Sequence, residues 1–175
     1  MSLLNVKIGH KAPDLCNAVI EVPRGCNNKY ELDKETGCIT LDRVLHSPFF
    51  YPADYGFFPE TLCDDGDPLD VLVLIKEPTF PGVVVPVRPI GYMQMSDEKG
   101  GDEKVIAVAD GDPEYADIND LADLPANTTK AIGHFFAEYK RNEKGKFATI
   151  GEWYGADEAK KLIQASQTHY EQSSK

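Results

Sequence analysis

Four aspartates stand within seven consecutive residues of this chain: Asp64, Asp65, Asp67 and Asp70. Two like charges about 4 Å apart repel by roughly 4 kcal/mol at the effective dielectric of a protein cleft. Gly66 and Pro68 favour a tight bend within the segment, and the largely apolar run 69–75 that follows indicates a buried strand. The segment is therefore either a solvated acidic loop or a rigidly mounted group of carboxylates that requires bound cations.

The spacing of these acids excludes an EF-hand. Counted from Asp65, the sixth position, where an EF-hand needs glycine, is Asp70, and the twelfth position, where it needs glutamate, is Lys76. Calcium buffering is accordingly not predicted.

The run Asp65-Gly66-Asp67-Pro68-Leu69-Asp70-Val71 resembles, without gaps, the signature of the soluble, magnesium-dependent inorganic pyrophosphatases of family I. The resemblance extends over most of the chain, from Glu21 to Lys140. It implies a metal-dependent hydrolase that cleaves inorganic pyrophosphate into two phosphates. The chain length is similar to that of the shorter prokaryotic members, which implies a homohexamer.

The resemblance implies six metal ligands: Asp65, Asp70, Asp97, Asp102, Glu21 and Glu31. Asp65, Asp70 and Asp102 would hold the first metal, and Asp70 would also help to hold the second. Asp97 and Asp102 would receive metals that arrive with the substrate. Judged from its own strand alone, however, Glu21 is an ordinary outward-facing residue.

The same resemblance implies roles in substrate binding and catalysis. Four residues would grip phosphate oxygens: Lys29, Arg43, Tyr139 and Lys140. Tyr51 and Tyr55 would orient groups around Asp67 and the metals, Lys104 would be a supporting cation, and Asp67 would be the general base.

The chemistry of these residue types agrees with the resemblance. Carboxylate ligands without a cysteine or histidine cluster suit Mg²⁺, with Mn²⁺ as a possible substitute, better than Zn²⁺. Cleavage of a phosphoanhydride needs an activated water and neutralised phosphate oxygens, which a two-metal site with flanking Lys and Arg can supply. The sequence contains no G-x-x-x-x-G-K-[ST] phosphate loop, so a small substrate is favoured over a nucleotide.

Period-two patterns predict short strands, which lie at residues 18–23, 29–33, 38–45, 83–95 and 105–108. Prolines and a glycine within 83–95 suggest a bent strand of a barrel. Gly100 and Gly101 are expected to form a hairpin turn that brings Asp97 close to Asp102. The aromatic segment 49–59 is broken by two prolines and cannot be a regular helix.

The period then changes to about 3.6 residues. A helix is predicted from near Pro125 to Lys140 and Arg141, with an apolar stripe that covers the barrel. A second helix is predicted from Ala156 to about Tyr170, followed by a frayed tail. The expected fold is thus α+β: a small OB-like antiparallel β-barrel flanked by two C-terminal helices.

The length of 175 residues and the 42% hydrophobic content predict one domain, residues 1–175. The net charge of −11 opposes binding to nucleic acid or to anionic membranes. The N-terminal residues lack a secretory pattern and no apolar stretch approaches eighteen residues, so we expect a cytoplasmic protein with free structural thiols.

Three other readings stay open at this level. Barrels of this kind also occur as OB modules that bind nucleic acid, although the acidic charge opposes that use. A metal-dependent phosphatase acting on nucleotides or phosphomonoesters is the nearer alternative, and a structural metal-binding domain is the third. The charge of Asp54 within the aromatic segment has no explanation from the sequence, beyond a possible effect on metal affinity.

Overall fold

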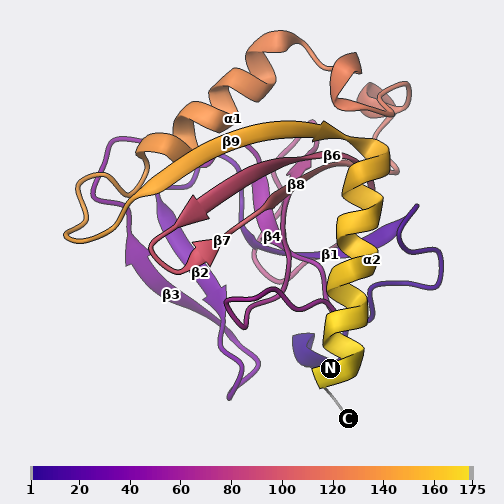
Figure 1. The fold of residues 1–175 in the computed structure, drawn as a ribbon, viewed down its shortest axis with the longest axis horizontal. Helices are drawn as coiled ribbons and strands as arrows, with labels where there is room; N and C mark the ends of the chain where they lie inside the picture. Colours follow the sequence, from indigo (N-terminus) through magenta and orange to yellow (C-terminus); the bar gives the residue numbers. More distant parts are fainter. Residues whose placement is uncertain (1, 174–175) are drawn as a thin grey trace.

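The computed structural model describes residues 2–173. Its centre is a seven-stranded sheet whose path β1-β4-β5-β8-β6 closes on itself because β6 also pairs with β1. These five strands are β1 (Cys16–Val22), β4 (Asp54–Phe57), β5 (Asp70–Leu74), β8 (Lys104–Ala109) and β6 (Val84–Asp97). The predicted barrel with two C-terminal helices is confirmed (Figure 1).

One pairing in the barrel departs from the predicted antiparallel pattern. Strands β5 and β8 are parallel, and all other pairs are antiparallel among the described residues. The long strand β6 lies between them in sequence, so β8 returns in the direction of β5. The parallel register places Asp70 beside Lys104 at the first residue of each strand.

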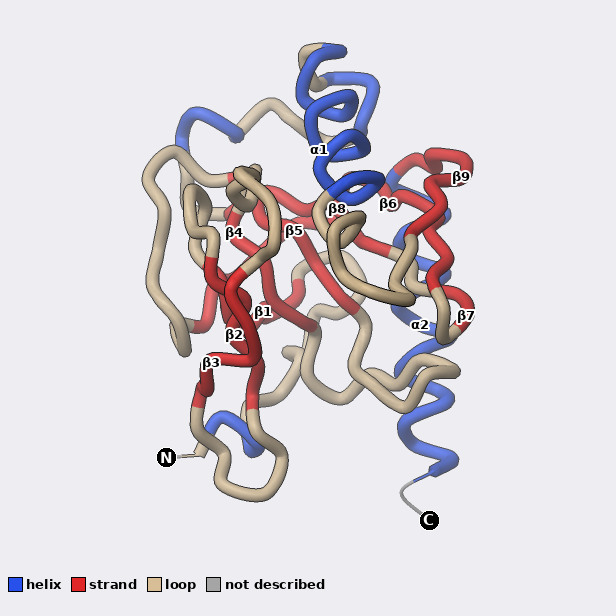
Figure 2. The backbone as a smooth tube through the Cα atoms, turned by 90° about the vertical axis from the view of Figure 1, so that its left-hand side faces the viewer, coloured by secondary structure: helices blue, strands red, loops and turns tan. Residues whose placement is uncertain are grey.

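Strands β5 and β8 are buried on both faces, which explains the nearly continuous apolar run after the acidic turn. Leu72 and Leu74 pack in a core cluster with the helix α1 (Ala126–Glu138), whereas Val71 and Val73 pack in a second cluster with the helix α2 (Ala156–Ser173). The helices lie on different sides of the sheet (Figures 1 and 2). The acidic turn is therefore attached to one of the best-buried strands of the molecule.

A separate hairpin carries two of the predicted cations. It consists of β2 (Asn28–Leu32) and β3 (Ile39–Val44), which form a two-stranded sheet that extends from the barrel (Figure 2). Lys29 pairs with Arg43 across the hairpin. At its turn, the side chain of Asp33 accepts hydrogen bonds from the backbone N–H groups of Glu35 and Thr36, at 2.8 and 3.0 Å.

The predicted turn at Gly100 and Gly101 was misplaced by two residues. Gly100 and Gly101 form the short strand β7 (Gly100–Gly101), which pairs with Asp97 and Ser96, so the chain reverses at Glu98 and Lys99. The Asp97 carboxylate closes this turn by accepting a hydrogen bond from the Lys99 N–H at 2.8 Å. An Asx-type bond of this kind can stabilise a reversal without glycine at its centre.

A strand between the two helices was not predicted. Strand β9 (Ala148–Gly155) pairs with the outer part of β6, and α1 lies over it (Figure 1). Its residues are exposed or half-buried, and it contains Gly151 and Gly155, so it lacks the alternating apolar pattern of a core strand. Pairing with the unusually long β6, rather than local propensity, creates this strand.

The helix boundaries also differ from those expected. Helix α1 ends at Glu138, with Tyr139 as its C-cap, so Lys140 and Arg141 lie in the following turn rather than in the helix. Helix α2 continues to Ser173, beyond the expected end near Tyr170, and residues 174 and 175 of the predicted frayed tail lie outside the described residues. Among residues 2–173, three short 3₁₀ helices complete the fold: η1 (Leu3–Asn5), η2 (Pro113–Tyr115) and η3 (Leu121–Asp123).

The structure explains the charge of Asp54 and shows the state of the four cysteines. Asp54 is buried and accepts hydrogen bonds from the backbone N–H of Arg24 at 2.8 Å and from both the N–H and the hydroxyl of Thr79, at 2.8 and 2.6 Å. Its carboxylate therefore ties two loops to β4. The four cysteines are all free, as expected.

The pairing of β1 with β4 predicts a sharp intolerance at Gly56. A Cβ atom added there would lie 1.9 Å from the carbonyl oxygen of Val19, a backbone atom that cannot move without breaking the sheet. We expect Gly56→Ala to lower the free energy of unfolding by about 3 kcal/mol, the upper part of the usual range for overpacking. Equilibrium urea denaturation gives the measurement.

Gly111→Ala is the matched control, because its added methyl group would meet no atom within 4 Å and its backbone needs no positive φ. It should change the free energy of unfolding by less than about 0.5 kcal/mol. If Gly56→Ala unfolds at the same urea concentration as the parent, the close approach of β1 and β4 is incorrect.

Candidate active site

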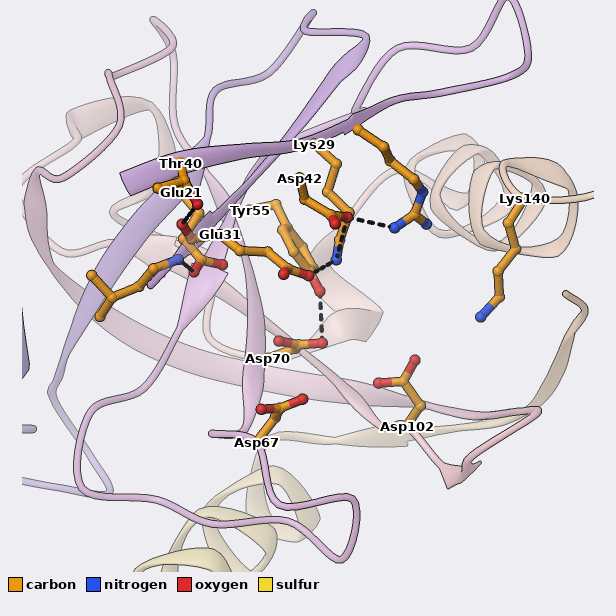
Figure 3. A network of polar contacts seen from close by, with 12 residues as sticks. Glu21, Lys29, Glu31, Thr40, Asp42, Tyr55, Asp67, Asp70, Asp102 and Lys140 are labelled. Atoms are coloured by element: carbon orange, nitrogen blue, oxygen red, sulfur yellow. Dashed lines mark hydrogen bonds and ion pairs between the residues drawn. The ribbon is translucent and has the colours of Figure 1, made fainter. Parts of the chain in front are cut away.

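Residues from the barrel, the hairpin and the turn after α1 line a single open cavity of about 700 Å³. Every predicted site residue except Tyr51 lines it: Glu21, Lys29, Glu31, Arg43, Tyr55, Asp65, Asp67, Asp70, Asp97, Asp102, Lys104, Tyr139 and Lys140. Figure 3 shows Asp67, Asp70 and Asp102 facing the hairpin residues Lys29, Glu31 and Asp42. The fold thus gathers side chains that are more than 100 residues apart in sequence.

The acidic turn is held by its own backbone. The N–H of Cys63 donates to the carbonyl of Asp67 at 2.8 Å, and the N–H of Gly66 donates to the carbonyl of Cys63 at 3.1 Å. The side chain of Asp65 accepts a hydrogen bond from the N–H of Asp67 at 3.0 Å. Gly66 has a φ of +86°, a conformation that glycine adopts without strain. The turn is therefore fixed before the buried strand β5 begins at Asp70.

Asp70 is contacted from two neighbouring strands, β4 and β8. The hydroxyl of Tyr55 donates to its Oδ2 at 2.6 Å, and the ammonium of Lys104 forms ion pairs with both Asp70 and Asp102. Lys104 is only 2% exposed. Burial alone would favour the neutral amine, but the attraction of Asp70 and Asp102 outweighs it and raises the pKa of Lys104, which stays charged. A cation thus separates two predicted metal ligands.

Lys140 makes a second contact of this kind, with the carboxylates of Asp97 and Glu98. Its ammonium lies 2.8 Å from Oδ2 of Asp97 and 3.2 Å from Oε2 of Glu98. Burial acts to raise the pKa of Asp97, but hydrogen bonds from Lys140 and from the Lys99 N–H prevail and hold it below its usual range. The turn after α1 is in this way joined to the turn between β6 and β7.

The hairpin wall carries alternating charges. Lys29 forms an ion pair with Glu31 and lies 3.6 Å from a carboxylate oxygen of Asp42. Asp42 also accepts from Nη1 of Arg43 at 2.7 Å, and Nε of Arg43 donates to Glu143 at 2.9 Å. Both predicted phosphate-binding cations of the hairpin are therefore oriented by neighbouring carboxylates.

Glu21 is buried rather than outward-facing, so the reading of its strand in isolation was wrong. It lies on β1 where the β2–β3 hairpin crosses the barrel, and its Oε1 accepts a hydrogen bond from the N–H of Leu32 at 2.7 Å. Burial raises the pKa of Glu21 to about 8. Local alternation does not show this, because the hairpin that covers Glu21 comes from elsewhere in the chain. A cation nearby would favour the ionised carboxylate.

The tyrosines fall into two groups. Tyr55 and Tyr139 line the cavity, whereas Tyr51 is buried behind Tyr55, with ring centroids 5.3 Å apart, and against Phe135 at 4.8 Å. The contribution of Tyr51 that this arrangement supports is packing behind Tyr55. Its role towards the substrate remains a prediction.

The donor set fits a hard divalent cation. The acids of the cavity offer only oxygen donors, which Mg²⁺ and Mn²⁺ prefer. Between residues 2 and 173, no three Asp, Glu, His or Cys side chains lie close enough to share one ion. Lysine ammonium groups lie among the acids instead: Lys104 pairs with Asp70 and Asp102, and Lys140 pairs with Asp97.

The sequence reasoning missed several charged residues in or beside the cavity wall, among them Lys34, Asp42, Glu98 and Glu143. Lys34 extends from the hairpin turn to Oδ1 of Asp67, at 2.7 Å. Asp42 and Glu98 adjoin predicted site residues, and that adjacency was a usable signal. Glu143 carries no local signal, because its partner Arg43 is 100 residues away.

Comparisons with known proteins agree with this geometry. The family model described as inorganic pyrophosphatase matches residues 18–171, a range that includes every predicted site residue. This chain belongs to the inorganic pyrophosphatase family. The resemblance seen in the acidic turn is therefore confirmed.

The relatives cover nearly the whole chain. An inorganic pyrophosphatase of Leifsonia xyli subsp. xyli is 59% identical over 149 residues, which are 85% of this chain and 91% of the relative. The crystal structure of inorganic pyrophosphatase from Thermus thermophilus has a TM-score of 0.95 at 47% identity, and the match covers 98% of this chain and 99% of that one. That of Helicobacter pylori has a TM-score of 0.91 at 40% identity, over 95% and 99% of the two chains.

The different roles predicted for the acids, as metal ligands, and for the cations, as phosphate contacts, imply two classes of variant. Arg43→Ala and Lys140→Ala should each weaken pyrophosphate binding about tenfold or more, since charge-assisted hydrogen bonds to phosphate are lost, while metal affinity without substrate stays nearly unchanged. Asp70→Asn should instead lower that metal affinity, because a ligand charge is removed. Calorimetric titration with Mg²⁺, in the absence of substrate, separates the two classes. Loss of resting metal binding in Arg43→Ala would refute the division.

Proposed function

We propose that this chain uses Mg²⁺, or Mn²⁺ as a substitute, to carry out the reaction of its family, the hydrolysis of inorganic pyrophosphate to two phosphates. The observation that carries the proposal is the single cavity in which carboxylates from the acidic turn and from β6–β8 face lysine and arginine side chains. An acid set alone would suit metal storage, and a cation set alone would suit anion binding. Their combination suits a metal-assisted attack on a polyanion.

The acids are proposed to hold the metals: Asp65, Asp70, Asp97, Asp102, Glu21 and Glu31. When bound there, Mg²⁺ would neutralise phosphate oxygens and make a water molecule more acidic. Tyr55 orients Asp70 through its hydrogen bond to Oδ2. Lys104 balances Asp70 and Asp102 and acts as the supporting cation.

The cations are proposed to bind the substrate. Arg43 presents a planar group that suits two oxygens of one phosphate, whereas Lys29 and Lys140 act as point charges. Tyr139 can donate a hydrogen bond from the wall between them without adding charge. Their positions on the hairpin and after α1, in the wall of one cavity, support this assignment.

Asp67 is proposed as the general base that takes the proton of the attacking water. It follows Asp65 on the fixed turn, and its side chain is about half exposed to the cavity. Lys34 contacts Oδ1 of Asp67, so Oδ2 is the oxygen that we assign to the proton.

We propose that residues 1–175 form one domain, that the protein is cytoplasmic, and that it neither binds nucleic acid nor associates with membranes, for which the net charge of −11 is the physical argument. No helix within residues 2–173 is both long enough and apolar enough to cross a bilayer. A homohexamer is proposed from the resemblance, and the exposed side chains of Phe50, Phe80 and Phe147 are compatible with subunit contacts.

The function is tested by measuring phosphate release from pyrophosphate and, in parallel, from ATP. Release should require Mg²⁺, should stop after exhaustive chelation, and should be far faster with pyrophosphate than with ATP. Ca²⁺ as the sole metal should inhibit, because it accepts the same carboxylates with a larger and less regular coordination shell. Activity that survives chelation would refute the metal requirement, and equal rates with ATP would indicate the phosphatase alternative.

Asp67→Asn provides the sharpest test of the assigned base. Asparagine is nearly isosteric but cannot take a proton, so the variant should fold, bind Mg²⁺ like the parent, and lose a factor on the order of 10²–10⁴ in turnover at neutral pH. Higher pH should restore part of the loss, since water then ionises more readily without a base. The measurement is a pH–rate profile of both proteins at saturating Mg²⁺. Near-parental turnover would exclude Asp67 as base, and weak Mg²⁺ binding would make it a ligand instead.

A further inference from the structure

Glu143 is a buried carboxylate just outside the cavity wall. It lies in the turn after α1, where its side chain is 6% exposed. Its Oε1 accepts a hydrogen bond from Nε of Arg43 at 2.9 Å, and its Oε2 lies 2.9 Å from the ammonium of Lys146. Burial acts to raise the pKa of Glu143, but these two contacts hold it below its usual range. The carboxylate is therefore charged and occupied on both oxygens.

The contact with Glu143 determines which part of the Arg43 side chain is free. A guanidinium has five N–H donors in a rigid plane. Glu143 takes the donor on Nε, and Asp42 takes one donor on Nη1 at 2.7 Å. The end of the plane formed by Nη1 and Nη2 keeps three donors. Two fixed carboxylates thus restrict a side chain with many rotamers and leave its outer end for a phosphate.

The turn that carries Glu143 is attached to the same region by other bonds. The side chain of Asn142 donates to the carbonyl of His46 at 2.8 Å, and the N–H of Glu143 donates to the carbonyl of Lys140 at 3.0 Å. Glu143 therefore connects Arg43 on β3 with the turn that presents Lys140. Arg43 and Lys140 lie in different parts of the chain, and both are assigned to phosphate oxygens.

We propose that Glu143 is a positioning residue for pyrophosphate: it fixes the plane of the Arg43 guanidinium so that its outer end faces the cavity. The inference rests on the proposed function, because it takes Arg43 as a contact to phosphate oxygens. Glu143 does not line the cavity and touches no reacting atom. Its effect passes through Arg43, which distinguishes it from a residue that only stabilises the turn.

A double-mutant cycle separates these two roles. The proteins are the parent, Glu143→Ala, Arg43→Ala and the double variant, each assayed for kcat and KM with pyrophosphate at saturating Mg²⁺. We expect Glu143→Ala to raise KM about tenfold with kcat changed less than about threefold, since the contact acts on substrate binding. In the Arg43→Ala background, removal of Glu143 should change KM less than about twofold, because the residue it positions is gone.

Glu143→Gln should rescue most of the effect, because its amide oxygen still accepts from Nε of Arg43. Binding of methylenediphosphonate, a pyrophosphate analogue that is not hydrolysed, should weaken in the same order, as measured by calorimetry. Glu138→Gln is the matched control, since Glu138 pairs with the exposed Arg141 beside the same turn and should leave KM unchanged. Urea denaturation of each protein shows whether it is folded, and the cycle is run with Glu143→Gln if the alanine variant is not.

The outcomes are distinguishable. If the parent does not hydrolyse pyrophosphate, the proposed function itself fails. If the parent is active and the loss caused by Glu143→Ala is equally large without Arg43, or if KM is unchanged in Glu143→Ala, then Glu143 does not position Arg43.

Discussion

Charge compensation among converging carboxylates is the constraint on which the site depends. Asp70 is the first residue of β5 and Asp102 lies two residues before β8, and their repulsion would be several kcal/mol without a cation between them. The buried ammonium of Lys104 provides that charge, because the parallel register of β5 and β8 places Lys104 beside Asp70. Asp97 is balanced in the same way by Lys140. Acids and cations are thus arranged as pairs, and ammonium groups balance the carboxylates that we propose as metal ligands.

The scaffold is suited to hold such a cluster. Strands β5 and β8 are buried on both faces, between α1 on one side and α2 on the other, so their first residues cannot move far. The acidic turn and the Lys104 side chain start from these strands. The β2–β3 hairpin, by contrast, is a two-stranded sheet outside the barrel. Its cations, Lys29 and Arg43, are oriented by ion pairs with Asp42 and Glu143 rather than by packing in a core. We infer that these ion pairs serve mainly to orient the two side chains.

Prediction from the sequence succeeded where a local pattern had a single physical meaning. Residues 69–75 are apolar enough to require burial, and strand β5 is the result. The stripe at Ile132, Phe135 and Phe136 required a helix that covers a core, and α1 does so. Prediction failed where the meaning depended on a distant partner. Strand β9 exists because β6 offers an unpaired edge, and Glu21 is buried because the hairpin crosses over it.

The sequence by itself determined the acid-rich turn, its attachment to a buried strand, and a set of residue types that suits the binding of hard cations and phosphate. These features follow from the charge, size and periodicity of residues along the chain. Only the tertiary structure decided which charges meet. The pairing of Lys104 with Asp70, the hydrogen bonds by which Asp54 ties two loops, and the contact of Glu143 with Arg43 all join residues distant in sequence. Electrostatic and packing interactions depend on distance in space, which no local pattern encodes.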